Sequence, residues 1–229
     1  MKTRLLFLIA GSLFMQQVQA QLAIKLGLGS NKFSEVQYSH TLGSNSGQSM
    51  YMDAPTGGAF YLPLQVGYTS PEARSYDVGL GLDIGTMKVK SGDKDFRTGL
   101  MRPNFYVQYY IINNWAPLQF GLGAAVSYSK IKCEWTESYS NDADQMVEYS
   151  AKTSWGGLGY GVSLLGRYWF GDDEENAIEF GIGSRADWRK LKSLNVNGAE
   201  ESFDKGDISN LYETSGMFFQ LSFVRAIGG

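Results

Sequence analysis

Residues 75–85 read SYDVGLGLDIG, and every second residue of this stretch is apolar. The apolar positions are Tyr76, Val78, Leu80, Leu82 and Ile84. Aspartates and glycines stand between them, so the alternation of period two predicts a β-strand with one apolar and one polar face. In a soluble barrel the apolar face points inward, whereas in a membrane barrel it points outward at lipid. The class of protein therefore depends on which face meets water.

Seven other segments alternate in the same way. Each approaches or reaches the roughly 9–11 residues that a tilted strand needs to cross a bilayer. They are 21–29, 60–69, 101–111, 118–128, 158–170, 178–188 and 217–223. Together the eight segments predict an all-β fold, an eight-stranded antiparallel up-and-down transmembrane β-barrel.

The other face of these segments is rich in glycine and carries eight charges. The charged residues are Lys25, Asp77, Asp83, Arg102, Arg167, Glu179, Arg185 and Asp187. If that face met lipid, each cation near the midplane would cost about 2–4 kcal/mol. The four cations together would cost about 8–16 kcal/mol, comparable with the roughly 5–15 kcal/mol that stabilises a whole domain. A membrane barrel must therefore turn its apolar faces outward. Alternation by itself leaves open a soluble lipocalin-like barrel with the charges in water.

Aromatic residues gather at both ends of the predicted strands. Those near the short connections are Tyr68, Tyr76, Tyr109, Tyr110, Trp115, Tyr168, Trp169 and Phe170. Those near the long connections are Phe33, Phe60, Tyr128, Trp155, Trp188 and Tyr212. Two such bands match the two interfaces of a membrane and favour the membrane barrel.

Connection length alternates along the chain. The long connections are predicted at about 34–58, 88–99, 132–153 and 190–211, and the short ones read SPEARS, NNWA and GDDEEN. Outer-membrane barrels have short periplasmic turns and longer outer loops. The pattern therefore places both ends of the barrel on the periplasmic side.

The last strand contains a short assembly pattern. Thr214, Gly216, Phe219 and Leu221 resemble the C-terminal signal by which outer-membrane barrels are recognised by the barrel-assembly machinery. The chain departs from that signal because it continues as RAIGG after the strand and does not end on an aromatic residue.

The first 20 residues have the three parts of a secretory signal peptide. Lys2 and Arg4 precede an apolar run from Leu5 to Phe14, and Val18-Gln19-Ala20 forms a cleavage site. The run is shorter than the roughly 20 residues of a membrane anchor helix. We expect residues 1–20 to be the signal peptide and residues 21–229 to form one barrel domain.

Composition narrows the function classes. The net charge of −3 indicates no nucleic-acid partner, and the single Cys133 excludes an internal disulfide. The 28 glycines among 229 residues need a structural reason, because neither a collagen period nor low complexity accounts for them.

Three stretches resemble the PorT-like outer-membrane β-barrel domain family of Bacteroidota. They are IKLGLGSNKFS at 24–34, FYLPLQVGY at 60–68 and YDVGLGLDIG at 76–85. The resemblance covers the mature chain and implies an outer-membrane location and an eight-stranded barrel. It transfers no activity to particular residues.

The eight charged residues determine whether the lumen is closed or conducts ions. An eight-stranded barrel leaves an interior that side chains just fill, and buried charges must be paired or hydrated. We expect four cations and four carboxylates to form a plug, with a narrow gated ion path as the alternative.

The sequence gives little support for catalysis or for metal binding. The one histidine, His40, lies beside Ser39 and precedes Asp53, but this spacing matches no catalytic triad. The acidic segments 90–95, 141–144 and 172–175 lack the calcium-loop pattern. We therefore expect no enzyme, no cofactor and no metal. A lipid-modifying enzyme is the most distant alternative.

The polar connections between the strands are the part of the sequence best suited to bind a partner. NSGQS, SYSNDADQ and NGAEESFDKGD lie in the predicted outer loops, and loops on a rigid scaffold are common binding sites. We expect a structural or surface-binding protein whose partners are outer-membrane lipid and a surface ligand or envelope protein.

Overall fold

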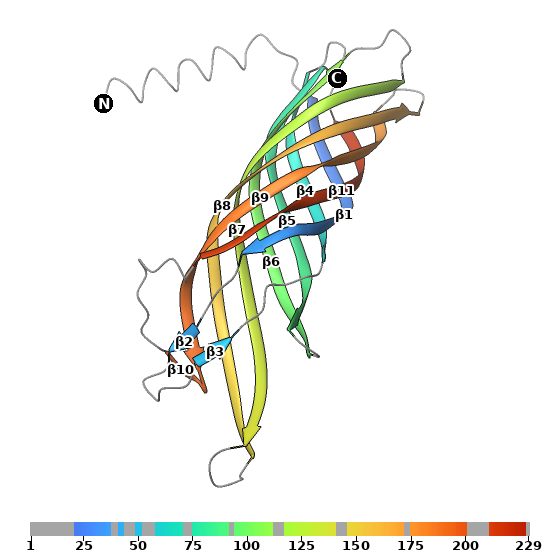
Figure 1. Cartoon of the computed structure of the whole chain (residues 1–229). Coiled ribbons are helices and arrows are strands. Elements are labelled where there is room, and N and C mark those ends of the chain that lie inside the picture. Colours follow the sequence, from blue (N-terminus) through green and yellow to red (C-terminus); the bar gives the residue numbers. More distant parts are fainter. Residues whose placement is uncertain are drawn as a thin grey trace, which may run out of the picture.

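The computed structural model describes residues 21–37, 41–43, 49–51, 58–70, 75–91, 94–111, 117–140, 146–171, 175–200 and 211–227. Eight long strands form the barrel (Figure 1). They are β1 (Gln21–Gln37), β4 (Gly58–Thr69), β5 (Tyr76–Ser91), β6 (Lys94–Ile111), β7 (Leu118–Ser140), β8 (Met146–Phe170), β9 (Asn176–Val196) and β11 (Leu211–Ile227). Among the described residues, no helix is long and apolar enough to cross a membrane.

Three short strands lie outside the barrel wall. β2 (Thr41–Gly43) pairs with β3 (Ser49–Tyr51) in a separate two-stranded sheet. β10 (Ala199–Glu200) turns back on β9 through Asn197 and Gly198, which both adopt positive φ.

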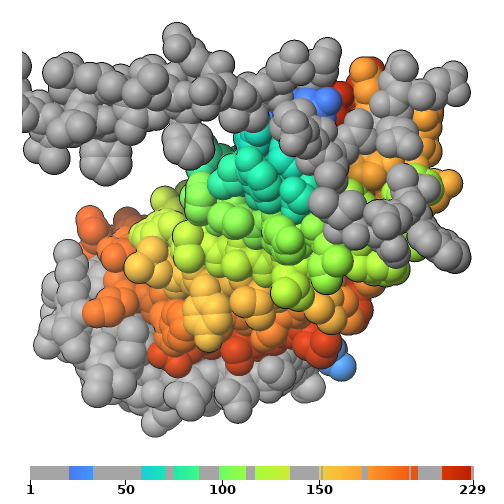
Figure 2. Space-filling model, turned by 90° about the horizontal axis from the view of Figure 1, so that it is seen from above, coloured from blue at the N-terminus to red at the C-terminus, as the bar shows by residue number. Residues whose placement is uncertain are grey.

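The wall is antiparallel throughout and closes on itself. Each long strand pairs with the next one in the chain, and the bands of colour in Figure 2 follow one another in that order. The first strand β1 pairs with the last strand β11, from Leu22 opposite Ile227 to Gln37 opposite Glu213. The predicted closed eight-stranded barrel is confirmed.

The apolar faces of the strands point outward. Leu64, Leu80, Phe105, Leu122 and Leu164 are exposed, and all five hold alternate positions of the segments that predicted the strands. The intervening residues point inward and are mostly polar, which is the reverse of a lipocalin-like cup with an apolar interior. The sheet therefore offers lipid a continuous apolar surface on which no backbone edge is open.

The long connections are shorter than expected, because the strands run on beyond the apolar segments. β7 and β8 are 23 and 25 residues long, and their hairpin extends furthest at the end of the long connections (Figure 1). The predicted connections 88–99 and 132–153 are therefore largely strand, and β9 extends into the connection predicted at 190–211 as far as Val196. Outside lipid neither face of a strand must be apolar, so alternation gives no signal there.

Three aromatic residues assigned to the belts lie inside the barrel. Tyr110, Trp155 and Trp169 are buried, whereas their neighbours Tyr109, Tyr168 and Phe170 are exposed. Successive residues of a strand face opposite sides, so a Tyr-Tyr or Tyr-Trp pair cannot place both rings in one membrane interface. Tyr76, Tyr128 and Trp188 also lie on the outer face and Tyr68 is half-buried, while Trp115 lies outside the described residues.

Reversing the polarity of the outer face tests its contact with lipid. Leu164 is 62% exposed and lies midway between Tyr168 and Tyr160 on β8. We expect Leu164→Arg to lower the free energy of unfolding in liposomes by about 2–4 kcal/mol, because the cation would sit near the bilayer midplane. Leu164→Ala is the control and should have a smaller effect. Equal stability of the arginine variant and the wild type in urea titrations would exclude lipid contact at this position.

Candidate functional site

All eight predicted charges are buried inside the barrel. They come from β1, β5, β6, β8 and β9, which lie on different sides of the lumen, and they separate into two groups along the barrel axis. The turn-side cluster lies toward the short connections and consists of Lys25, Asp77, Arg167 and Glu179. The loop-side cluster lies toward the long connections and consists of Asp83, Arg102, Arg185, Asp187 and a ninth charge, Arg189.

The turn-side cluster holds two cations and two carboxylates in mutual contact. Lys25 Nζ lies 2.8 Å from Asp77 Oδ2 and 3.1 Å from Glu179 Oε2. Arg167 forms ion pairs with the same two carboxylates, and its Nε donates to Glu179 Oε2 at 3.0 Å. Each cation therefore bridges both acids, and the cluster carries no net charge.

Neutral side chains complete the turn-side cluster. Tyr110 accepts a hydrogen bond of 2.6 Å from Arg167 Nη2 and donates to Glu179, and its ring centroid lies 4.0 Å from the guanidinium carbon. Thr69 Oγ1 donates to Asp77 Oδ1 at 2.6 Å, and Lys25 donates to Gln108. Buried charges are stabilised when further hydrogen bonds satisfy their remaining donors and acceptors, and these residues supply them.

The loop-side cluster is a chain of three arginines joined by two aspartates. Asp83 Oδ2 lies 2.9 Å from Arg102 Nη2 and 3.3 Å from Arg185 Nη1. Asp187 Oδ2 lies 3.4 Å from Arg102 Nη1 and 2.7 Å from Arg189 Nη2. The ion pairs thus run from Arg185 through Asp83, Arg102 and Asp187 to Arg189, and they leave three cations for two acids.

Arg189 is the functional residue that the sequence analysis missed. It is buried, and its guanidinium donates to Ser129 Oγ and Thr214 Oγ1, both at 2.8 Å. The apolar alternation predicts a segment that ends at Trp188, whereas β9 continues to Val196. Counting two residues on from Asp187 would have placed Arg189 on the inner face.

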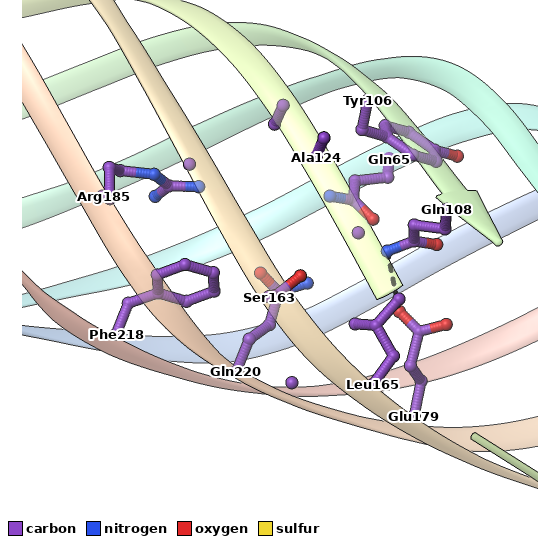
Figure 3. A pocket seen from close by; sticks show the side chains of 14 residues that line it. Gln65, Tyr106, Gln108, Ala124, Ser163, Leu165, Glu179, Arg185, Phe218 and Gln220 are labelled. Atoms are coloured by element: carbon purple, nitrogen blue, oxygen red, sulfur yellow. Dashed lines mark hydrogen bonds between the residues drawn. The ribbon is translucent and has the colours of Figure 1, made fainter. Parts of the chain in front are cut away.

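A small cavity separates the two clusters. Its volume is about 40 Å³, and it is lined by residues of both clusters and of the wall between them. Figure 3 shows Arg185 and Phe218 at one end and Glu179 with Gln108 at the other. Gln108 Nε2 donates to Glu179 Oε1 at 3.4 Å, so the carboxylate end of the cavity is already hydrogen-bonded.

The assembly pattern of the last strand divides between the two faces of the wall. Phe219 and Leu221 of β11 are exposed on the lipid side, and Gly216 is buried. Cys133 is a free, buried thiol.

Other candidates fall largely outside the described residues. His40, Ser39 and Asp53 lie outside them, as do the signal peptide and the central residues of the three acidic segments. Within the part of the chain that the structure describes, no three His, Cys, Asp or Glu side chains could together hold a metal ion.

The turn-side cluster predicts strong and non-additive effects of substitution. Arg167→Met leaves Lys25 as the one cation of the cluster against two buried carboxylates, so we expect the free energy of unfolding to fall by about 3–5 kcal/mol. Adding Glu179→Gln restores one acid for one cation and should recover part of that loss. Urea unfolding of the refolded barrel, followed by tryptophan fluorescence, measures both effects.

The matched control removes a cation from an exposed ion pair. Lys152 Nζ lies 2.5 Å from Glu134 Oε1, and both side chains are more than 60% exposed. We expect Lys152→Met to cost less than about 1 kcal/mol. Strictly additive losses in the double variant at 167 and 179 would contradict the coupling of the cluster.

Similar proteins are found among solved structures. No family model matches the sequence, and no curated protein matches it. The outer membrane protein OprG from Pseudomonas aeruginosa is 12% identical, with a TM-score of 0.55 over 93% of this chain and 100% of that one. Neisserial surface protein A is 14% identical, with a TM-score of 0.42 over 89% and 96% of the two chains. The outer membrane protein AlkL is 9% identical, with a TM-score of 0.44 over 93% and 92%. The similarity to OprG shows that this chain has the fold of a small bacterial outer-membrane β-barrel.

Proposed function

We propose that this chain is an integral outer-membrane β-barrel with a structural or surface-binding role and a lumen closed by its charges. The observation that carries the proposal is the pairing inside the barrel. Lys25 and Arg167 bridge Asp77 and Glu179 from opposite sides of the lumen, and an ion crossing the barrel must separate these pairs. Buried pairs of this kind resist separation because each partner left alone would be an uncompensated charge.

A small pore is the second candidate. The cavity of about 40 Å³ between the two clusters favours it, because the lumen is not completely filled at that level. On either side of the cavity, however, ion pairs cross the barrel, so a path exists only if both clusters rearrange.

The extension of β7, β8 and β9 beyond the aromatic belt supports the surface-binding role. Exposed lysines occupy this extension directly beyond Tyr128 and Trp188. They are Lys130, Lys132, Lys190 and Lys192. No carboxylate among the described residues forms an ion pair with them, although the nearby Lys152 is paired with Glu134. A lysine row at the edge of the lipid-facing band favours an anionic ligand, and phosphate-bearing headgroups lie at that depth in the outer leaflet.

The finer assignments rest on sequence patterns. We propose recognition by the barrel-assembly machinery through Gly216, Phe219 and Leu221, and membership in the PorT-like family through the stretches 24–34, 60–68 and 76–85. A surface ligand or envelope protein is the partner we infer for the outer loops. We infer no catalytic role, because the spacing around His40 matches no triad.

Single-channel recording in a planar bilayer tests the closed lumen. We expect the refolded wild type to be silent, whereas a variant with Arg102, Arg167 and Arg185 replaced by alanine should conduct, because the arginines that cross the lumen are gone. The control is a variant with alanine at Lys130, Lys132 and Lys190. It loses the same number of cations, all of them outside the lumen, and should stay silent. Gel mobility with and without heating confirms that each variant is folded. A steady wild-type current whose ion selectivity changes in the arginine variant would contradict the closed lumen and show that the barrel is a pore.

The lysine row is tested in nanodiscs. We expect the wild type to unfold at a temperature about 2–4 °C higher in discs containing an anionic phospholipid than in zwitterionic discs. A variant with glutamine at the four lysine positions should lose this difference, while Lys152→Gln should keep it. If the four-lysine variant kept the same difference in unfolding temperature between the two kinds of disc, lipid phosphate would be excluded as the ligand of this surface.

A further inference from the structure

The described charges of the lumen do not cancel. The turn-side cluster is neutral, but the loop-side cluster has the guanidinium groups of Arg102, Arg185 and Arg189 against the carboxylates of Asp83 and Asp187. Among the residues that the structure describes, one positive charge in the barrel interior therefore has no carboxylate of its own. An uncompensated buried charge is unfavourable in a low-dielectric interior.

Arg185 holds this excess charge. It reaches Asp83 Oδ2 through one contact of 3.3 Å, whereas Arg102 already binds the same oxygen through Nε and Nη2, both at 2.9 Å. The Arg185 guanidinium carbon also lies 4.7 Å from the ring centroid of Phe218 and 5.9 Å from that of Tyr61. Aromatic rings attract a cation but carry no net charge that could neutralise it.

The guanidinium of Arg185 points into the cavity between the clusters (Figure 3). Arg185 itself is only 6% exposed. Two other buried polar groups that line the cavity, Gln65 Oε1 and Tyr106 OH, have no hydrogen-bond partner. The hydroxyl of Ser163 lines it as well, and the wall beside Arg185 is Gly161, where a Cβ atom would lie 3.3 Å from Arg185 Nε.

We propose that this cavity binds a small monovalent inorganic anion, chloride in the cell envelope, against Arg185. A guanidinium has five N–H donors, and hydroxyl and amide groups can turn a donor toward an anion. The volume of about 40 Å³ exceeds the roughly 10–15 Å³ that a single water needs, so a halide ion fits. Water would satisfy hydrogen bonds in this cavity, but it cannot neutralise the charge.

The Glu179 end of the cavity offers no uncompensated positive charge that could bind the anion instead of Arg185. Glu179 is bound by Lys25, Arg167 and Tyr110, so its charge is compensated within the turn-side cluster. The anion therefore belongs beside Arg185, and its binding is independent of whether the lumen conducts.

Anomalous diffraction from crystals grown in bromide locates the ion. We expect a peak inside the cavity within hydrogen-bond distance of the Arg185 guanidinium nitrogens, and no such peak for Arg185→Gln crystallised in the same way. Ordered water without anomalous signal beside Arg185 in the wild type would overturn the proposal. That wild-type result decides the matter even if Arg185→Gln does not fold.

Thermal unfolding in detergent gives the solution test. At equal ionic strength, we expect the wild type to unfold about 2–4 °C higher in sodium chloride or bromide than in sodium gluconate, whose anion is too large for the cavity. Arg185→Gln should lose this halide dependence. Lys32→Gln removes an exposed cation from β1 and should retain it. Equal halide dependence in the wild type and Arg185→Gln would also overturn the proposal.

Discussion

Lipid accepts only apolar side chains on the outer face of a strand, and the rest of this structure follows from that constraint. Each residue facing lipid has neighbours facing inward, so eight strands deliver dozens of side chains into a lumen barely wide enough to hold them. Among the inward-facing side chains that the structure describes are five cations and four carboxylates. In so narrow a space they can remain charged only beside groups of opposite charge.

The charged clusters replace the hydrophobic core of a soluble domain. Lys25 on β1, Asp77 on β5, Arg167 on β8 and Glu179 on β9 meet near the barrel axis, although the chain separates Lys25 from Glu179 by 154 residues. Three of the four ion pairs join strands that do not pair through their backbones, and the fourth, between Arg167 and Glu179, joins the neighbouring strands β8 and β9. The network therefore fixes the shape of the barrel across its diameter, while the backbone hydrogen bonds fix it around the circumference.

Inside the membrane, the alternation of the sequence predicted the strands and the faces on which their aliphatic and charged residues lie. The same alternation could have assigned Tyr110 and Trp169 to the lumen, because each follows a residue on the lipid face. It could not give the extensions of β7, β8 and β9, because outside lipid no free-energy penalty enforces an apolar face. Arg189 was missed for this reason. The partners of each arginine could not be predicted either, since they depend on the tilt and stagger of strands around the whole barrel.

The pairing of β1 with β11 has a consequence for the order of events in folding. The wall can close only after the final strand has been made, and Lys25 at the beginning of the chain meets Glu179 only at that stage. If strands entered the bilayer one by one, each would expose its charges to hydrocarbon before their partners arrived. Closure and insertion must therefore be coupled, and the dominance of distant contacts makes an unassisted reaction slow. A factor that held the early strands until the last one was in place would shorten that delay.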